Sequence, residues 1–492
     1  MKHKKDKQRI LQQIRMRDVA LYIMRINYRK RRKKRKLKRL GKLCIVVREL
    51  KSPRWLYRMN FSNYNSSTKN NNINDKKRES IQKYLPSNLK YITTQKDSPF
   101  NLDLIRQSGN KYISKGVIII PEHFSLLDNT EQSIDVFRKM LSALLLENIN
   151  FVAFDYKNCK SIDLSTQVLF DIILTEYKKF INLKVNKCIQ FPRSYGGNNL
   201  NDESVSKMMW SVGSPANLGI GQKNYSDVEK FKLRIYDNTK ESDENKRMAN
   251  KEFDTTEIAD YVVNSLKRIG KKLTSTKLND LCTVIGEILI NAEEHSTTKH
   301  RFSCGYFKEE KIDGKHFGLF RLVILNFGET IYEKFKSDKC PNKNMVLRMK
   351  ELSDKYTRKL LFLPGKFEEE TLWTLYALQE GVTSVSTDSY KRGNGSIRFI
   401  ESFFNIKGSQ DDDNISRMTI VSGFTKIVFD GTYSITEGTS SDGTNHKMMT
   451  FNDSGNIENI PDNKYVMHTN NYFPGTMICA ELLLNDDDIK QI

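Results

Sequence analysis

One apolar segment interrupted by polar residues constrains the fold of this chain more than any other stretch. In GEILINAEEHS, residues 286–296, Glu287 and Asn291 stand four positions apart. On a helix, residues four apart lie on the same face. Apolar side chains would cover the other sides of this helix, namely Leu281, Val284, Ile285, Ile288 and Leu289. The pattern predicts a largely buried helix that presents a carboxylate and a carboxamide together, an arrangement suited to a magnesium-bound nucleotide.

The length and the apolar pattern predict a globular protein with several domains. The chain has 492 residues, enough for two or three domains with cores of their own. No window approaches the roughly 18 uninterrupted apolar residues of a membrane helix, and the N-terminus lacks the apolar core of a signal peptide. We therefore expect a cytoplasmic protein without a transmembrane segment. The seven cysteines are scattered and show no CxxC spacing, so neither a disulfide framework nor a zinc site is expected.

The net positive charge is concentrated at one end of the chain. Residues 1–58 contain 23 Lys and Arg against 3 Asp and Glu, so 20 of the 22 net positive charges lie in this basic arm. Apolar residues recur at helical spacing in 9–28, and every residue in 29–39 except Leu37 is basic. Like charges at this density repel one another unless a polyanion neutralises them. We expect the arm to be helical or disordered and to bind nucleic acid, because its Lys and Arg would release counter-ions from phosphates.

Other partners for the basic arm stay open at this point. Aromatic residues that could stack on bases lie close by, at Tyr22, Tyr28, Trp55 and Tyr57. A basic amphipathic helix is also attracted to an anionic membrane surface. In a eukaryotic host the basic run would be a nuclear-import signal, and a solubilising tail is the simplest alternative.

The middle of the chain divides by composition. Residues 59–97 are rich in Asn, Ser, Lys and Thr and are predicted to be a polar linker that buries nothing. In residues 98–192 strand-like and helix-like stretches alternate, which predicts a small α/β domain. Strands are expected at 116–124 and 150–156, and helices at 133–146 and 165–180. Residues 193–245 are predicted to be a second linker with one strand, at 230–237.

The sequence FDYKNCKSIDLST, residues 154–166, resembles a loop of the STAS domain, the fold of anti-sigma-factor antagonists. STAS domains that act as phospho-switches carry Ser directly after the Asp of this loop, whereas this chain has Leu164 after Asp163. Ser165 and Thr166 follow one and two positions late. The resemblance therefore implies a docking or dimerisation module for a protein partner. His123, after the first expected strand, has no visible nucleophile or metal partner and is interpreted as a loop histidine.

Four separated features follow one another in residues 246–492. They are Glu287 and Asn291 with His295 a turn later; Asn326 and Gly328 at the end of an apolar strand in 319–331; Lys391, Arg392, Gly393, Asn394 and Gly395 before an expected helix; and Gly475 and Thr476 at the start of a strand in 473–484. In this order they resemble the boxes of the GHKL ATPase superfamily, which includes DNA gyrase, MutL, histidine kinases and the anti-sigma-factor serine kinases. The form EILINAEEHS is most similar to the last group. The resemblance implies a GHKL (Bergerat-type) α/β sandwich that binds ATP and Mg²⁺.

The resemblance also implies a role for each feature. Asn291 would be a ligand of Mg²⁺, Glu287 would orient or deprotonate the water that attacks the γ-phosphate, and His295 would contact phosphate or simply pack. Asn326 stands where the family has an Asp that accepts from the adenine amino group, and Thr330 replaces the second glycine of that box. The loop residues Lys391, Arg392, Gly393, Asn394 and Gly395 would bind phosphates, and Gly475 and Thr476 would lie beneath the adenine.

A long region between the second and third features is expected to be the lid. It contains two helical stretches, at 344–361 and 367–380, and a polar hinge at 381–389 that would close over ATP. The leading hypothesis is a slow Mg-dependent ATPase that acts as a conformational switch, with or without homodimerisation, and regulates engagement of nucleic acid or a protein partner. The alternatives are a serine kinase of the anti-sigma type and a catalytically inactive scaffold in a bacterial stress or defence system.

Overall fold

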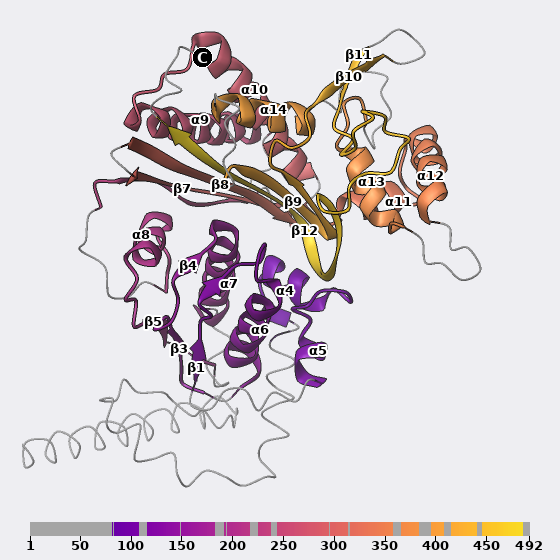
Figure 1. Ribbon diagram of the computed structural model, residues 1–492. Helices are drawn as coiled ribbons and strands as arrows, with labels where there is room; N and C mark the ends of the chain where they lie inside the picture. Colours follow the sequence, from indigo (N-terminus) through magenta and orange to yellow (C-terminus); the bar gives the residue numbers. More distant parts are fainter. Residues whose placement is uncertain are drawn as a thin grey trace, which may run out of the picture. The chain divides into compact units, whose positions relative to one another are not determined.

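The computed structural model describes a mixed α/β protein (Figure 1). The described residues are 81, 83–107, 116–147, 149–182, 191–192, 194–216, 225–237, 244–294, 296–312, 315–357, 366–382, 395–407, 415–439 and 445–485. The basic arm, with its helix and aromatic predictions, lies outside this set. No helix within the described ranges is long and apolar enough to cross a membrane.

A five-stranded antiparallel sheet forms the centre of the C-terminal half. Its strand order is β6-β7-β8-β12-β9. The strands are β6 (Val228–Asp237), β7 (His300–Ile312), β8 (Lys315–Phe327), β12 (Val466–Asn485) and β9 (Arg417–Phe429). Because side chains alternate along a strand, each strand contributes one set of residues to each face. Both faces of this sheet are largely apolar, which requires cover on both sides.

Three helices cover one face of the sheet: α9 (Glu244–Arg268), α10 (Ser275–Glu294) and α14 (Gly395–Lys407) (Figure 1). The expected buried helix around 286–296 is therefore present as α10, although Ser296 lies beyond its end. Its apolar residues Ile285, Ile288 and Leu289 are buried in one core with Ile324 of β8 and Leu482 of β12. This face, called the helix face below, carries the polar residues that the sequence singled out.

The N-terminal α/β segment, residues 81–216, covers the opposite face. It contains a three-stranded parallel sheet in the order β1-β3-β5 and a short parallel pair, β2 with β4. The elements are α4 (Ser87–Thr94), α5 (Leu102–Gln107), β1 (Val117–Ile119), β2 (His123–Phe124), α6 (Thr130–Leu141), the π-helix η1 (Ser142–Leu146), β3 (Phe151–Asp155), β4 (Ser161–Ile162), α7 (Leu164–Asn182), β5 (Ser194–Asn198) and α8 (Glu203–Val212).

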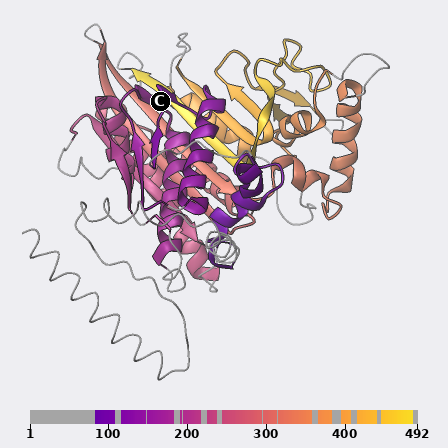
Figure 2. The same cartoon turned by 90° about the horizontal axis from the view of Figure 1, so that it is seen from below.

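Helices α7 and α8 of this segment contact strands β6, β7 and β8. Figure 2, seen from below, shows the purple helices lying across the sheet. The residues of the sheet that face them, such as Phe302, Tyr306 and Leu325, are fully buried. The two segments thus share an apolar interface. Their described residues, within 81–182 and 191–492, form one compact unit. The predicted boundaries at 192 and 245 stay predictions.

The remaining elements lie beside the sheet (Figure 1). They are α11 (Ile331–Lys336), α12 (Lys343–Thr357), α13 (Glu369–Ala377) and a hairpin of β10 (Thr436–Thr439) with β11 (Asn445–Met448). Helices α12 and α13 correspond to the two helical stretches expected at 344–361 and 367–380. The hinge expected at 381–389 lies outside the described residues from position 383 onward.

Two sequence interpretations of linkers need correction. The polar linker expected at 59–97 is wrong for its last part, because Leu89 and Ile92 of α4 are buried. Ile81 and Leu85, which precede α4, are buried as well, and the surrounding polar residues concealed these apolar positions. The linker expected at 193–245 contains β5 and α8 as well as the expected strand β6, and α8 buries its apolar side against the sheet.

Candidate functional site

A row of polar side chains crosses the helix face near one end of the sheet. Strand pairing places Tyr236 opposite Arg301, Arg301 opposite Asn326, Asn326 opposite Thr476, and Thr476 opposite Ser422. Directly opposed residues in antiparallel strands project to the same face. The next row on this face is apolar in three strands, with Ile324, Ile478 and Ile420. The polar residues thus interrupt an apolar surface. They are called the polar row below and are Tyr236, Arg301, Asn326, Thr476 and Ser422.

Arg301 is the charged residue of the polar row, and its side chain is buried. Its guanidinium pairs with Asp254 of α9 (2.8 Å) and lies 3.8 Å from the Glu293 carboxylate of α10. It also stacks 4.1 Å from the centre of the Tyr236 ring. Burial lowers the pKa of Arg301, and both carboxylates oppose that shift. Arg301 thus ties the middle of α9 and the C-terminal end of α10 to the sheet while its own charge is neutralised.

Asn326 and Thr476, both predicted as nucleotide contacts, are neighbours in the polar row. Asn326 is only 2% exposed, and its side-chain nitrogen Nδ2 has no hydrogen-bond partner among the described residues. The Thr476 hydroxyl lies 3.0 Å from the Ser422 hydroxyl. Ser422 also accepts from the amide of Ile331 (3.0 Å) and donates to the carbonyl of Gly475 (3.2 Å). Ser422 therefore links three elements beneath Thr476.

One of the two predicted glycines has a structural reason of its own. Gly475 has a φ of 147°, and a side chain there would collide with the carbonyl of Asn326. Glycine at this position lets the end of β8 and the middle of β12 approach closely, which explains the residue type without a ligand. Gly328 is buried just after β8, where its amide donates to the carbonyl of Pro474 (3.4 Å).

Thr330, which replaces the second glycine of the family pattern, begins helix α11. Its hydroxyl accepts from the amide of Glu333 (3.1 Å), and the Glu333 carboxylate accepts from the amide of Thr330 (2.8 Å). This reciprocal arrangement is a capping box. The turn that follows Asn326 is consequently held rigid, and Thr330 itself is fully buried.

Glu287 and Asn291 are both half-buried on α10. Burial raises the pKa of Glu287, and the positive charge of Arg398 on α14 partly offsets that rise. One carboxylate oxygen of Glu287, Oε2, is buried without a hydrogen-bond partner in the described structure. A carboxylate with a raised pKa and a free oxygen is suited to accept a proton. Ser296, just after α10, donates to the carbonyl of Phe327 (3.2 Å), which ties this end of the helix to the end of β8.

Several predicted site residues lie outside the described residues: His295, Lys391, Arg392, Gly393 and Asn394. Gly395 is the first residue of α14, and α14 packs along α10. The first turn of α14 lies near Glu287, because Arg398 acts on that carboxylate. Within the described ranges, no group of three or more His, Cys, Asp and Glu side chains is arranged to hold a metal ion.

Sequence reasoning missed Arg301, Ser422 and Arg398. The strands β7 and β9 were not expected at all, because each mixes polar and apolar residues without a clear alternation. A local signal existed for Arg301, which directly precedes the run FSCGYF, residues 302–307, with its aromatic residues and cysteine. A charged residue inside a strand is buried only when it is paired, so its carboxylate partners had to be known first.

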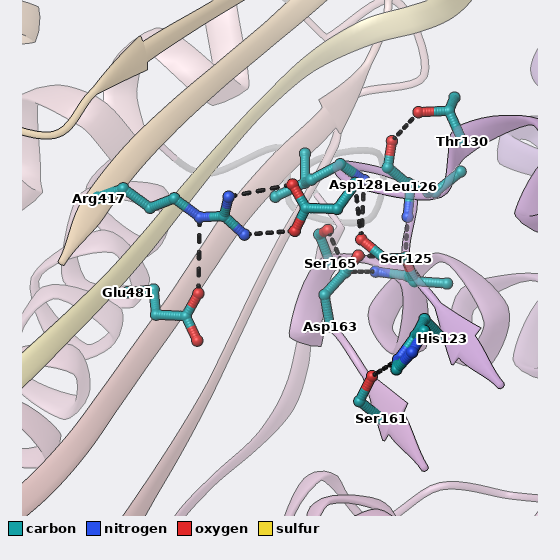
Figure 3. A network of polar contacts seen from close by, with 12 residues as sticks. His123, Ser125, Leu126, Asp128, Thr130, Ser161, Asp163, Ser165, Arg417 and Glu481 are labelled. Atoms are coloured by element: carbon teal, nitrogen blue, oxygen red, sulfur yellow. Dashed lines mark hydrogen bonds and ion pairs between the residues drawn. The ribbon is translucent and has the colours of Figure 1, made fainter. Parts of the chain in front are cut away.

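The loop that resembles a STAS phosphorylation site lies at the interface with the sheet (Figure 3). Asp163 accepts from the hydroxyls of Ser165 (2.5 Å) and Thr166 (2.8 Å) and from the amide of Thr166 (2.6 Å). Ser165 and Thr166 are 1% and 0% exposed. Their hydroxyls therefore stabilise the start of α7 and are inaccessible to a kinase in this conformation.

Figure 3 also shows an ion pair that joins the N-terminal α/β segment to the sheet. Arg417 of β9 forms a bidentate pair with Asp128 (3.0 and 2.5 Å) and lies 3.7 Å from Glu481 of β12. His123 was interpreted as a loop histidine, but it lies in the short strand β2, where its ring is 2.9 Å from the hydroxyl of Ser161 on the neighbouring strand β4.

In comparisons with known proteins, no family model, no curated protein and no solved structure matches this chain. The residues and contacts described above are therefore the basis for proposing a function.

Proposed function

We propose that the chain binds ATP with Mg²⁺ at the polar row and helix α10, hydrolyses it slowly, and uses nucleotide binding as a conformational switch. In this proposal residues 246–492 are a GHKL-type ATP-binding domain and residues 98–192 a STAS-like domain. One observation carries the proposal: the buried carboxamide of Asn326 has an unpartnered nitrogen beside Thr476. A buried polar atom without a partner costs about 1–3 kcal/mol, and the polar edge of a nucleotide base would remove that cost.

The residues around this point fit a nucleotide. Asn326 and Thr476 offer hydrogen bonds to a base, and the glycine-rich loop before α14 would approach the phosphates. Asn291 would contribute its side-chain oxygen to Mg²⁺, which takes its remaining ligands from phosphates and water. When bound, Mg²⁺ would neutralise phosphate charge. Glu287, with its raised pKa and free oxygen, would orient a water molecule and accept its proton.

The test compares nucleotide binding with phosphate release. We expect the full chain to bind ATP with Mg²⁺ in calorimetry and to release phosphate slowly. Glu287→Gln should retain binding and lose at least about 100-fold in release rate, the lower end of the range for removal of a general base. Glu252→Gln, on the exposed surface of neighbouring α9, is the matched control and should behave as wild type. Binding without turnover in wild type and both variants would instead favour a non-catalytic scaffold, and absence of binding would refute the proposal.

The STAS-like segment supports a regulatory role by its position. It covers one face of the sheet, and the polar row lies on the other face. Strands β8 and β12 contact the segment on one side and carry Asn326 and Thr476 on the other. The serine-kinase alternative would require an accessible acceptor, and Ser165 and Thr166 are buried. Incubation with labelled ATP followed by mass spectrometry tests it: phosphate on either residue would favour that alternative.

The partner of the switch is proposed to be nucleic acid, bound by the basic arm at residues 1–58. The supporting observation is the charge of the arm, 23 basic against 3 acidic residues. Titration of DNA and RNA at several salt concentrations should show a steep salt dependence that deletion of residues 1–58 removes. Unchanged affinity and salt slope after the deletion would contradict this role. Vesicles containing anionic lipid, titrated in parallel, distinguish a membrane surface from nucleic acid.

A further inference from the structure

The side chain at the centre of the polar row can recognise more than one kind of base. A carboxylate only accepts hydrogen bonds, whereas a carboxamide has one accepting oxygen and a nitrogen that donates two. Asn326 is a carboxamide, is 2% exposed, and has an unpartnered Nδ2. The buried atom that lacks a partner is thus a donor, and it requires an acceptor on the ligand. A carboxylate at this position would require the opposite.

The two purines differ in the order of donor and acceptor on the edge that such a side chain would meet. Adenine presents an amino donor beside a ring-nitrogen acceptor, and guanine presents a carbonyl acceptor beside a ring N–H donor. A carboxamide pairs with either edge when it turns by 180° about its terminal bond. A carboxylate accepts from only one of the two groups on either edge, the amino group of adenine or the ring N–H of guanine, and its other oxygen faces the neighbouring acceptor without a hydrogen bond.

The neighbours of Asn326 in the polar row do not select one orientation of its amide. Thr476 and Ser422 are two hydroxyls 3.0 Å apart, and either can donate to the other. Because hydroxyl hydrogens rotate, this pair can reverse its direction when the amide turns, with Ser422 then giving up its bond to the carbonyl of Gly475. Arg301 on the other side is committed to Asp254 and Glu293. The row around Asn326 is therefore adaptable on the Thr476 side and neutralised on the Arg301 side.

We infer that the site accepts both adenine and guanine nucleoside triphosphates, and that Asn326 is the residue that determines this breadth. The inference rests on the proposed function, since it takes the nucleotide to lie at the polar row. It names the substrate class as purine nucleoside triphosphates, broader than the ATP expected from the sequence.

The test measures binding of ATP, GTP and CTP to the full chain in the presence of Mg²⁺. Wild type should bind ATP and GTP with dissociation constants within about tenfold of each other, and CTP more weakly, because its single ring places a different edge at Asn326. In Asn326→Asp the binding of both ATP and GTP should weaken at least about tenfold, because a carboxylate leaves one acceptor of either purine opposed to its own buried oxygen. Thermal unfolding of the variant verifies that it folds.

Each outcome separates the inference from the function. A wild type that binds ATP but binds GTP more than about 100-fold more weakly refutes the inference and leaves the proposed function standing. Equal binding of CTP and ATP also refutes it, because the base would not be read. If Asn326→Asp folds and keeps the wild-type affinities for ATP and GTP, Asn326 is not the determinant. Absence of binding by all three nucleotides refutes the proposed function itself. If the variant does not fold, the wild-type ratios alone decide.

Discussion

Replacing Asp171 by Asn should stabilise this protein at neutral pH and leave it almost unchanged in acid. Asp171 lies on α7, on the buried side of the N-terminal α/β segment, and is 1% exposed. Its carboxylate accepts from the side chains of Gln167 (2.9 Å) and Ser214 (2.6 Å). Among the described residues, no Lys or Arg contributes to its pKa. Burial raises its pKa from 3.8 to about 7, against the opposing effect of these two hydrogen bonds. The neutral acid is thus the favoured form in the folded protein.

The sign and size of the effect follow from linkage. The folded protein holds this proton up to about pH 7, and the unfolded chain releases it near pH 4, so the contribution of Asp171 to the free energy of unfolding falls as the pH rises between these values. Each pKa unit corresponds to about 1.4 kcal/mol, which gives a cost of about 4 kcal/mol above pH 7. At pH 5 the cost is about 2 kcal/mol. Asn keeps the accepting oxygen and cannot ionise, so it avoids this cost.

The assay is urea unfolding of wild type and Asp171→Asn at several pH values between 5 and 8. The difference between the two free energies of unfolding cancels every other titrating group and should grow by about 2–3 kcal/mol across this range in favour of the variant. Asp103→Asn on α5 removes a carboxylate that is 67% exposed and serves as the control, with an expected flat difference. A flat difference for Asp171→Asn as well would refute the assignment of Asp171 as a buried, proton-retaining acid.

Three further predictions concern the sheet. A double-mutant cycle of Asp128→Ala and Arg417→Ala in urea unfolding should give a coupling energy of about 0.5–1 kcal/mol, because the pair is partly exposed, and zero coupling would show that it does not hold the segment. Ser422→Ala should lower the free energy of unfolding by about 1–3 kcal/mol, since it leaves a buried amide at the start of α11 without an acceptor; an unchanged value would contradict that contact. In thermal melts Gly475→Ala should lower the melting temperature more than Gly431→Ala does. Both glycines have a positive φ, but only Gly431 has open space where a side chain would be added, so equal effects would argue against close packing at 475.

Local periodicity in the sequence predicted the elements that bury one clear stripe. Helices α7 and α10 were expected at nearly their observed positions, as was the end of β8 at Asn326, because apolar spacing over one element depends only on neighbours in the chain. The same reasoning found Glu287 and Asn291 on a shared helix face. It failed where an element is short or polar, as at α4, α8, β5 and β7, since these are held by contacts from distant parts of the chain.

The polar row was decided by the tertiary structure alone. Its members come from five strands and span residues 236 to 476, so their alignment depends on the strand order and on the pairing register. A shift of one residue in any pairing would turn that member to the opposite face. Asn326 and Thr476 were visible in the sequence as separate candidates, whereas Arg301 and Ser422 acquired meaning only beside them. Residue types are written in the sequence, but which buried donor lacks an acceptor is determined by what the folded strands place next to it.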